Sequence, residues 1–248
     1  GFPSRSLISL DIKNMFNAIS REKARQIVSR DFPELEGFVD CLYQDSGRQC
    51  IRLADGSWDV IEVQEGFSQG CPASPILAAL VLTSILSKIN RDLSLDATSR
   101  LNDGNEYDDG QGGKPLILGY VDDVNVLLPT QDVERFFHLF RLYGAGIDSS
   151  NERVSPGLGA ILNTEKTRIM TTTSGRSIRD RLLCSFNHQQ RQTGASLARA
   201  IRDFSTKDND PYEETNGLRI LGSPIGSQAF CNDFILSMVH KAVAASDK

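Results

Sequence analysis

An apolar stretch with two adjacent carboxylates at its centre constrains this chain more than any other feature. Residues 116–129 read LILGYVDDVNVLLP, and Asp122 and Asp123 interrupt an otherwise apolar run. Two like charges side by side in a segment that favours burial are costly unless solvent, hydrogen bonds or a cation compensates them. The stretch therefore predicts a β-hairpin whose turn lies either in solvent or next to a positively charged group.

Composition limits the class of protein. The chain has 248 residues, 40% of them hydrophobic and 24% charged, which suffices for one large domain or two small ones. The longest apolar run, residues 75–86, is too short to span a bilayer and includes Thr83 and Ser84, so we expect a buried helix and no membrane partner. A net charge of −5 argues against a surface that holds a polyanion by itself.

The cysteines and the first residues indicate the setting of the chain. There is no C-x-x-C pair and no histidine at metal-ligand spacing, so we expect reduced thiols in an intracellular protein, nuclear or cytoplasmic and not secreted. The chain starts at Gly1 and a strand pattern follows within a few residues, so we expect it to lie inside a larger protein. The five cysteines are Cys41, Cys50, Cys71, Cys184 and Cys231.

The first part of the chain alternates strand and helix patterns. Residues 4–12 alternate in polarity and predict a buried strand that ends in Asp11. Ser20 is placed to cap a first helix, and a second helix is expected after Pro33. Residues 48–66 then predict two strands joined by a tight turn.

The later part begins with a long, mostly apolar helix, which we expect from Ser74 to Asn90. A mobile, acidic and glycine-rich loop is expected over 94–114. An amphipathic helix with Thr130 as its N-cap candidate follows the hairpin at 116–129. The remaining expected elements are a strand-like tail closing 159–172, a helical stretch at 195–204, a short hairpin at 217–227 and the start of a helix at 232–245.

Three carboxylates stand at predicted strand ends, Asp11 after the first strand and Asp122 with Asp123 at the hairpin turn. If these strands are neighbours in one sheet, Asp11 and Asp122 converge at one edge, and converging carboxylates bind hard divalent cations such as Mg²⁺. Two such ions bridged by acids are a general solution for in-line phosphoryl transfer. Each part alone also has an ordinary explanation, because Asp-Asp pairs occur in exposed turns and a single Asp often ends a strand.

Five stretches, taken in order, resemble motifs A to E of the reverse transcriptase palm. They are LDIKNMFNAI (10–19), EGFSQGCPASPIL (65–77), YVDD (120–123), GAILNTEKT (159–167) and LGSP (221–224), and the resemblance covers residues 5–227. The stretch QGCPASP is similar to the Q-G-D-P-x-S-P of non-LTR (LINE-like) retrotransposon enzymes, with Cys71 where Asp is common. Ser68 stands where retroviral and group II intron enzymes more often have Pro, and the N-x-x-K-T form within GAILNTEKT also resembles non-LTR elements.

The resemblance implies an α+β fold, in which an antiparallel sheet carries helices on one face in a ferredoxin-like β-α-β-β-α-β core. It also implies that the fingers are missing and that the thumb is at most begun. The implied parts are a palm over residues 1–173, a polar basic insertion over 174–216, a motif E hairpin over 217–227, and the start of a thumb or connecting helix over 228–248.

The resemblance assigns catalytic roles as well. Asp11 and Asp122 would ligate two Mg²⁺ ions, which Mn²⁺ could replace, with the Ile12 backbone carbonyl as a further ligand and Asp123 completing the acidic triad. One ion would activate the primer 3′-hydroxyl, and the other would hold the triphosphate and the leaving pyrophosphate. Lys166 stands where the family often has a cation near the pyrophosphate, and a solvated lysine is the alternative.

Phe16 lies five residues after Asp11, where the family has a bulky side chain that blocks a ribose 2′-hydroxyl, so deoxynucleotides would be favoured. Packing of Phe16 under the following helix is the alternative. The other substrate contacts that the resemblance implies are the backbone N–H groups of Asn14 and Met15 at the triphosphate, Gln69 and Gly70 beneath the incoming nucleotide, Tyr120 beside the primer terminus, and a primer grip that contains Leu221 and Gly222.

The implied function is that of an RNA-directed DNA polymerase fragment from a retrotransposon, which binds an RNA template, a DNA primer and a dNTP. Its further partners would be the fingers, thumb and endonuclease of a parent polyprotein, and without them we expect poor binding of template and primer. Two alternatives stay open: a catalytically inactive or domesticated remnant that binds nucleic acid or protein, and a nucleotidyl cyclase on a similar sheet. The intact acids and Phe16 argue against the remnant, and the Gln-Gly-x-Pro helix start argues against the cyclase.

Overall fold

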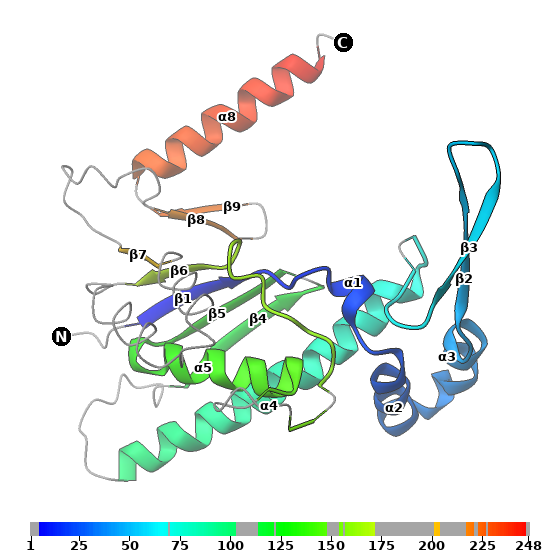
Figure 1. The fold of residues 1–248 in the computed structure, drawn as a ribbon. Helices are drawn as coiled ribbons and strands as arrows, with labels where there is room; N and C mark the ends of the chain where they lie inside the picture. Colours follow the sequence, from blue (N-terminus) through cyan, green and yellow to red (C-terminus); the bar gives the residue numbers. More distant parts are fainter. Residues whose placement is uncertain are drawn as a thin grey trace.

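A five-stranded sheet forms the body of the molecule (Figure 1). The computed structural model describes residues 5–68, 70–102, 114–121, 123–147, 154–155, 157–171, 201–203, 217–220, 223–226 and 228–246. The strands of the sheet are β1 (Arg5–Leu10), β4 (Leu116–Tyr120), β5 (Asp123–Pro129), β6 (Arg168–Thr171) and β7 (Ile201–Asp203), in the spatial order β4-β5-β1-β6-β7. The first four are antiparallel to their neighbours, and β7 is parallel to β6.

Burial alternates along β1, the central strand of this sheet. Ser6, Ile8 and Leu10 are buried, and the residues between them are partly exposed. The buried Ser6 hydroxyl is hydrogen-bonded to the Thr130 hydroxyl (3.0 Å), so its polar group is satisfied inside the core.

Two helices cover one face of the sheet, α4 (Ala73–Asn102) and α5 (Val133–Phe140) (Figure 1). The buried residues of α4 recur at helical spacing, and on α5 a cluster of three phenylalanines is fully buried. The segment Ala73–Asp96 is long and apolar enough to cross a membrane, but it packs against the sheet as a core helix. The order β1-α4-β4-β5-α5-β6 follows the β-α-β-β-α-β sequence that the pattern predicts, and the fold is mixed α/β with antiparallel sheets.

Three expectations about single elements are wrong. The loop expected from residue 94 begins later, because α4 continues to Asn102, before the first glycine of that stretch at Gly104. Residues 201–203 form strand β7 instead of helix, because pairing with the exposed edge of β6 outweighs their local preference. Thr130 is not an N-cap; it is the first residue of the 3₁₀ turn η2 (Thr130–Asp132), which leads into α5.

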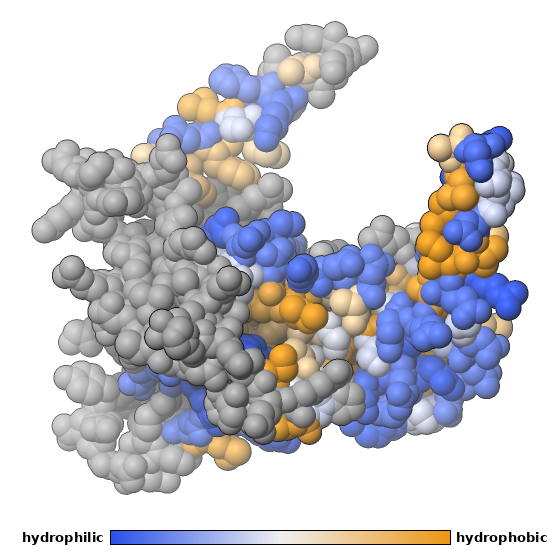
Figure 2. All heavy atoms as spheres, viewed as in Figure 1, coloured by the Kyte–Doolittle hydropathy of each residue, from blue (hydrophilic) through white to orange (hydrophobic). Residues whose placement is uncertain are grey.

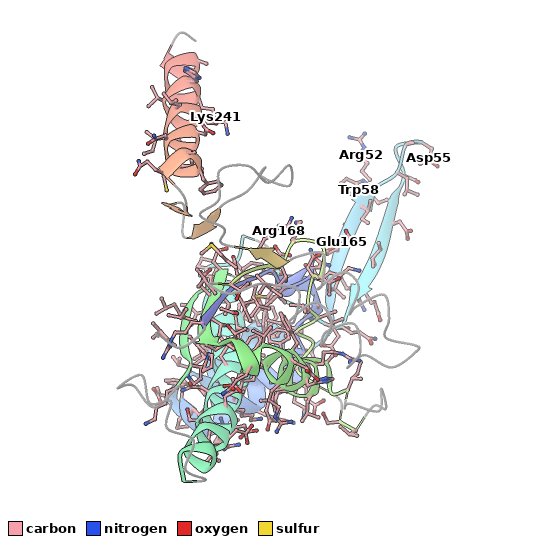
Figure 3. The ribbon with its side chains drawn as sticks, turned by 90° about the vertical axis from the view of Figure 1, so that its left-hand side faces the viewer. Arg52, Asp55, Trp58, Glu165, Arg168 and Lys241 are labelled. Atoms are coloured by element: carbon pink, nitrogen blue, oxygen red, sulfur yellow. The ribbon has the colours of Figure 1, made fainter. Side chains whose placement is uncertain are left out.

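A smaller unit precedes α4 in the chain. It consists of α1 (Met15–Ala18), α2 (Arg21–Asp31), the 3₁₀ turn η1 (Pro33–Leu35), α3 (Glu36–Tyr43) and a hairpin of β2 (Gly47–Arg52) and β3 (Trp58–Val63). The predicted Ser20 cap is confirmed, because the Lys23 N–H donates to the Ser20 hydroxyl (3.4 Å). Among the described residues, β2 and β3 pair only with each other, and the hairpin extends away from the body (Figures 1 and 3).

The C-terminal elements lie on the other side of the sheet from α4 and α5. A third predicted hairpin is confirmed as β8 (Gly217–Ile220) and β9 (Ser223–Gly226), and it leads into α8 (Gln228–Ser246). Figure 2 shows a broad hollow between α8 and the β2–β3 hairpin, with hydrophobic surface along the hairpin. The face of the sheet that is free of α4 and α5 forms the floor of this hollow (Figure 1).

Candidate active site

Two carboxylates lie at the same end of neighbouring strands. The last paired residues of β1 and β5 are Leu10 and Val124, so Asp11 and Asp123 stand opposite each other at the next position. Leu10 and Val124 are buried in the core beneath the sheet. Since successive side chains of a strand point to opposite faces, the two carboxylates lie on the face that forms the floor of the hollow.

The turn between β4 and β5 is strained. Tyr120 pairs with Asp123, which leaves Val121 and Asp122 as a two-residue turn. Val121 has a φ of 55°, in the left-handed region that β-branched residues strongly disfavour. Strain of this kind persists only where the surrounding structure imposes it, and it is concentrated at functional sites. Asp122 lies outside the described residues, as does the side chain of Tyr120.

A loop from the later chain fixes the backbone of Asp11. The Asp11 N–H donates to the Thr167 hydroxyl (3.3 Å), and the Asn163 N–H donates to the Asp11 carbonyl (2.9 Å). Ile12 forms an isolated antiparallel bridge with Leu162. The hydrogen bonds of this bridge are made by the flanking residues, because the Lys13 N–H donates to the Ile161 carbonyl and the Asn163 N–H donates to the Asp11 carbonyl. The Thr167 side chain is fully buried and also donates to the Asn163 carbonyl (2.8 Å).

Asn163 and Thr167 are therefore positioning residues that the sequence reasoning left without a role. Both lie within the quoted stretch GAILNTEKT, and the only signal was a polar residue at each end of a short turn. Lys166, between them, is exposed. Glu165 and Arg168 lie on the side of the body nearest α8 and the hairpin (Figure 3), and the Arg168 guanidinium donates to the carbonyls of Glu165 (2.5 Å) and Thr167 (3.0 Å).

The segment after Asp11 turns sharply into α1. Asn14 has a φ of 50°, a left-handed conformation that asparagine tolerates, and its side-chain oxygen accepts a hydrogen bond from Asn17 (2.8 Å). Met15 is buried in the core, whereas Asn14 is exposed. Phe16 is half-buried, because one part of its ring packs against the core and the rest is exposed.

The segment before α4 contains the predicted Gln-Gly pair. Gln69 lies outside the described residues, and Gly70 has a φ of 90°, which only glycine adopts without strain. The next residue, Cys71, has a thiol whose pKa is lowered chiefly by a hydrogen bond from the Tyr43 hydroxyl, and burial raises the pKa of that tyrosine. Leu221 and Gly222, the predicted primer grip, lie outside the described residues, between β8 and β9.

Comparison with known proteins identifies the family of this chain. A family profile described as "Reverse transcriptase (RNA-dependent DNA polymerase)" matches residues 3–225. The chain belongs to the reverse transcriptase family. No curated protein matches this chain in sequence.

The fold of this reverse transcriptase is similar to that of a solved telomerase. Apo telomerase from Candida tropicalis, truncated from its C-terminal domain, aligns with 92% of this chain at 14% identity and a TM-score of 0.52. Telomerase from Candida albicans in complex with a fragment of telomeric RNA aligns with 92% at 12% identity and a TM-score of 0.49. The chain spans 35% and 31% of the lengths of those two proteins, so the likeness concerns the fold of one region.

Reverse transcriptases use divalent metal ions, and the donor set on the floor of the hollow fits them. Asp11 and Asp123 supply carboxylate oxygens, the ligands that Mg²⁺ prefers. On the same face, two residues along β5 from Asp123, the Asn125 side-chain oxygen is buried and has no hydrogen-bond partner among the described residues. The described residues contain no group of three or more acidic, His or Cys side chains around one point, and the third predicted acid, Asp122, lies outside them.

Proposed function

We propose that this reverse transcriptase chain is the palm of an RNA-directed DNA polymerase that adds a dNTP to a primer 3′-hydroxyl on an RNA template. The observation that carries the proposal is the placement of Asp11 opposite Asp123, on the open face of the sheet and beside the strained turn at Val121. The backbone of Asp11 is held in place by the core beneath the sheet and by hydrogen bonds to the loop 160–167. Fixed carboxylates at one edge are what two-metal nucleotidyl transfer requires.

In this proposal Asp11 and Asp122 hold two Mg²⁺ ions, with Asp123 and the Ile12 carbonyl in support, and Mn²⁺ can take the same ligands. The ions, when bound, supply charge neutralisation at the triphosphate and activation of the primer hydroxyl. The chain's own residues orient the reactants: Thr167 and Asn163 fix the backbone of Asp11.

Further residues complete the proposed substrate site. The exposed part of the Phe16 ring excludes a 2′-hydroxyl, and Lys166 assists at the pyrophosphate. The N–H groups of Asn14 and Met15 face the triphosphate. Gln69 and Gly70 support the nucleotide, Tyr120 the primer terminus, and Leu221 with Gly222 the primer strand.

We further infer that the parent is a non-LTR retrotransposon protein of the nucleus or cytoplasm. The stretch QGCPASP and the N-x-x-K-T form support this subfamily. The palm occupies residues 1–173, with an insertion over 174–216, the motif E hairpin over 217–227 and the start of the thumb over 228–248. A fingers region upstream and an endonuclease domain in the parent reading frame would support this origin, and a retroviral protease and integrase in that frame would contradict it.

The test of the catalytic proposal uses the full-length parent protein and a primed RNA template with Mg²⁺. We expect extension with dNTPs, loss of extension in Asp122→Asn, and a smaller loss in Asp123→Asn, because Asp122 carries metal ligation and Asp123 supports it. Asp31→Asn is the matched control, since this exposed acid on α2 pairs with Arg30. Absence of extension by the wild-type parent would contradict the proposal and favour a domesticated remnant, and equal losses in the two variants would contradict the division of roles.

A further inference from the structure

Arg21 is a cation buried inside the protein, and the Glu65 carboxylate accepts a hydrogen bond from its backbone N–H (3.1 Å), not from its guanidinium. Arg21 is the first residue of α2 and only 6% exposed. Among the described residues no carboxylate lies within 4.0 Å of its guanidinium. A buried charge is costly unless hydrogen bonds and polarizable groups replace its water. The hydrogen bonds and the ring contact that replace this water identify the segments that the Arg21 side chain holds in place.

The guanidinium binds the backbone that leads from the β2–β3 hairpin toward α4. Its Nε donates to the Gly66 carbonyl (2.5 Å), and its Nη1 donates to the Val63 carbonyl (2.8 Å). Its central carbon lies 5.3 Å from the centre of the Tyr43 ring, a cation–π distance. Arg21 therefore joins α2, the end of β3 and α3 at one point.

The segment that Arg21 holds lies directly against the helical turn of Phe16. The Gly66 N–H donates to the Ile19 carbonyl (3.0 Å), and the Phe67 N–H donates to the Phe16 carbonyl (2.5 Å). A Cβ added to Gly66 would lie 2.5 Å from backbone atoms of Asn17, so the two segments are as close as their backbones allow. A shift of residues 63–67 would therefore move the backbone of Phe16.

The same tyrosine reaches the other end of this segment. The Tyr43 hydroxyl is hydrogen-bonded to the buried Ser74 hydroxyl (3.0 Å), and that hydroxyl donates to the Ser68 carbonyl (2.8 Å). The Tyr43 ring also packs edge-on against Phe67, with 5.1 Å between the ring centres. Residues 66–68 are thus held by Arg21 on one side and by the first turn of α4 on the other.

We propose that Arg21 is a positioning residue for nucleotide selection, which acts by holding residues 63–67 against the backbone of Phe16. The inference rests on the proposed polymerase function, because Phe16 selects the sugar only if the site binds nucleotides. Arg21 touches no substrate in this proposal. It fixes the distance between the side chain that excludes the 2′-hydroxyl and the segment that leads to Gly70. Small displacements of a positioning contact have large kinetic effects.

The test compares Arg21→Met, which keeps the unbranched apolar stem and removes the guanidinium with its donors, with two further variants. Arg21→Lys keeps the charge without the planar fork, and Tyr43→Phe removes the bonds of the Tyr43 hydroxyl to Ser74 and Cys71 while keeping the ring. Arg25→Met is the matched control, because Arg25 lies one turn along α2 and pairs with Asp40 of α3 (2.6 Å) without touching residues 63–68.

In the full-length parent we expect Arg21→Met to raise the KM for dNTP and to lower the ratio of dNTP to rNTP incorporation by about tenfold, with Arg21→Lys and Tyr43→Phe intermediate. Arg25→Met should keep the wild-type ratio. A wild-type ratio and KM in a folded Arg21→Met protein would overturn the proposal. If Arg21→Met does not fold, Arg21→Lys decides by the same ratio.

A second measurement separates this inference from the proposed function. Hydrogen exchange of the 248-residue chain reports the amides of Gly66 and Phe67 whether or not the parent polymerises. We expect these two amides to exchange at least about tenfold faster in Arg21→Met than in Arg25→Met. Unchanged exchange would overturn the holding role of Arg21, whereas faster exchange together with an inactive wild-type parent would overturn the proposed function alone.

Discussion

Strand β5 of the sheet and strand β3 of the hairpin both carry several apolar residues, but only those of the sheet are largely buried. Val124, Val126 and Leu128 of β5 are almost completely buried, whereas Trp58 of β3 is 68% exposed and Val60 is 53% exposed. A two-stranded ribbon is only marginally stable in water on its own. The difference shows that an apolar alternating pattern specifies a strand, and that the packing partner decides how much stability the strand contributes.

The candidate site has one part on the sheet and another part near the hairpin. The carboxylates belong to the sheet, where the core holds the backbone, and the hairpin is connected to the site through residues 63–67. Damage to the sheet should therefore affect chemistry and stability strongly, and damage to the outer hairpin should affect them little.

The largest expected effect is on catalysis, from an acid of the sheet. Asp11→Asn in the full-length parent should lower the rate of primer extension by at least about 10³-fold, because it removes a principal metal ligand. Asp55→Asn is the matched substitution in the hairpin, where Asp55 only accepts hydrogen bonds from Ser57. Its rate should stay close to that of the wild type, and equal losses in the two variants would break the division between sheet and hairpin.

Next in size is the loss of a buried aromatic. Phe136→Ala should lower the free energy of unfolding by about 3–5 kcal/mol, because Phe136 is fully buried between α5 and the sheet and packs against Phe137 and Phe140. Trp58→Ala in the hairpin should change it by about 0.5 kcal/mol or less. Urea denaturation of the chain measures both, and a large loss in Trp58→Ala would show that the hairpin is covered in solution.

A smaller effect should come from the strained turn. Val121→Gly relieves a left-handed φ of 55°, so we expect the chain to gain about 1 kcal/mol of stability after the entropy of glycine is subtracted. Primer extension by the parent should slow, because the turn that carries the two acids loses its fixed geometry. The comparison substitution is Val60→Gly in β3, which relieves no such strain and should not stabilise the chain; a gain there equal to that of Val121→Gly would argue against strain as the cause.

The smallest effect concerns the junction between the two regions. The hydrogen bond from the Tyr43 hydroxyl lowers the pKa of the Cys71 thiol, so more thiolate is present at a given pH. Tyr43→Phe should therefore move the midpoint of Cys71 alkylation across a pH series upward relative to the wild type, and mass spectrometry of this site measures the midpoint in both proteins. An unmoved midpoint would remove Tyr43 as the cause.

Much of the local structure could be predicted from the sequence. The strand that ends near Asp11, the three hairpins and the Ser20 cap follow from alternation, turn residues and capping chemistry, which are local properties. The pairing of β1 with β5 joins residues more than one hundred positions apart, so Asp11 opposite Asp123 required either the family resemblance or the structure.

Features that depend on tertiary contacts could not be predicted from the sequence. Strand β7 forms because β6 offers an edge. Arg21 stands in the polar run SREKARQ and has the pattern of a solvated helix face, yet carbonyl groups and an aromatic ring from later segments bury it. The hydroxyl of Thr167 is likewise committed to the Asp11 backbone by the approach of two distant segments.

The bridge between Ile12 and Leu162 has a consequence for motion. The end of β1 is bonded to the loop 160–167 on one side and paired with β5 on the other, so the backbone of Asp11 cannot separate from that loop without breaking the bonds at Lys13 and Asn163. The acid and the loop should therefore open together as one cooperative unit. The protection of the Lys13 and Asn163 amides from hydrogen exchange would then report what fraction of molecules holds the acid and the loop closed together.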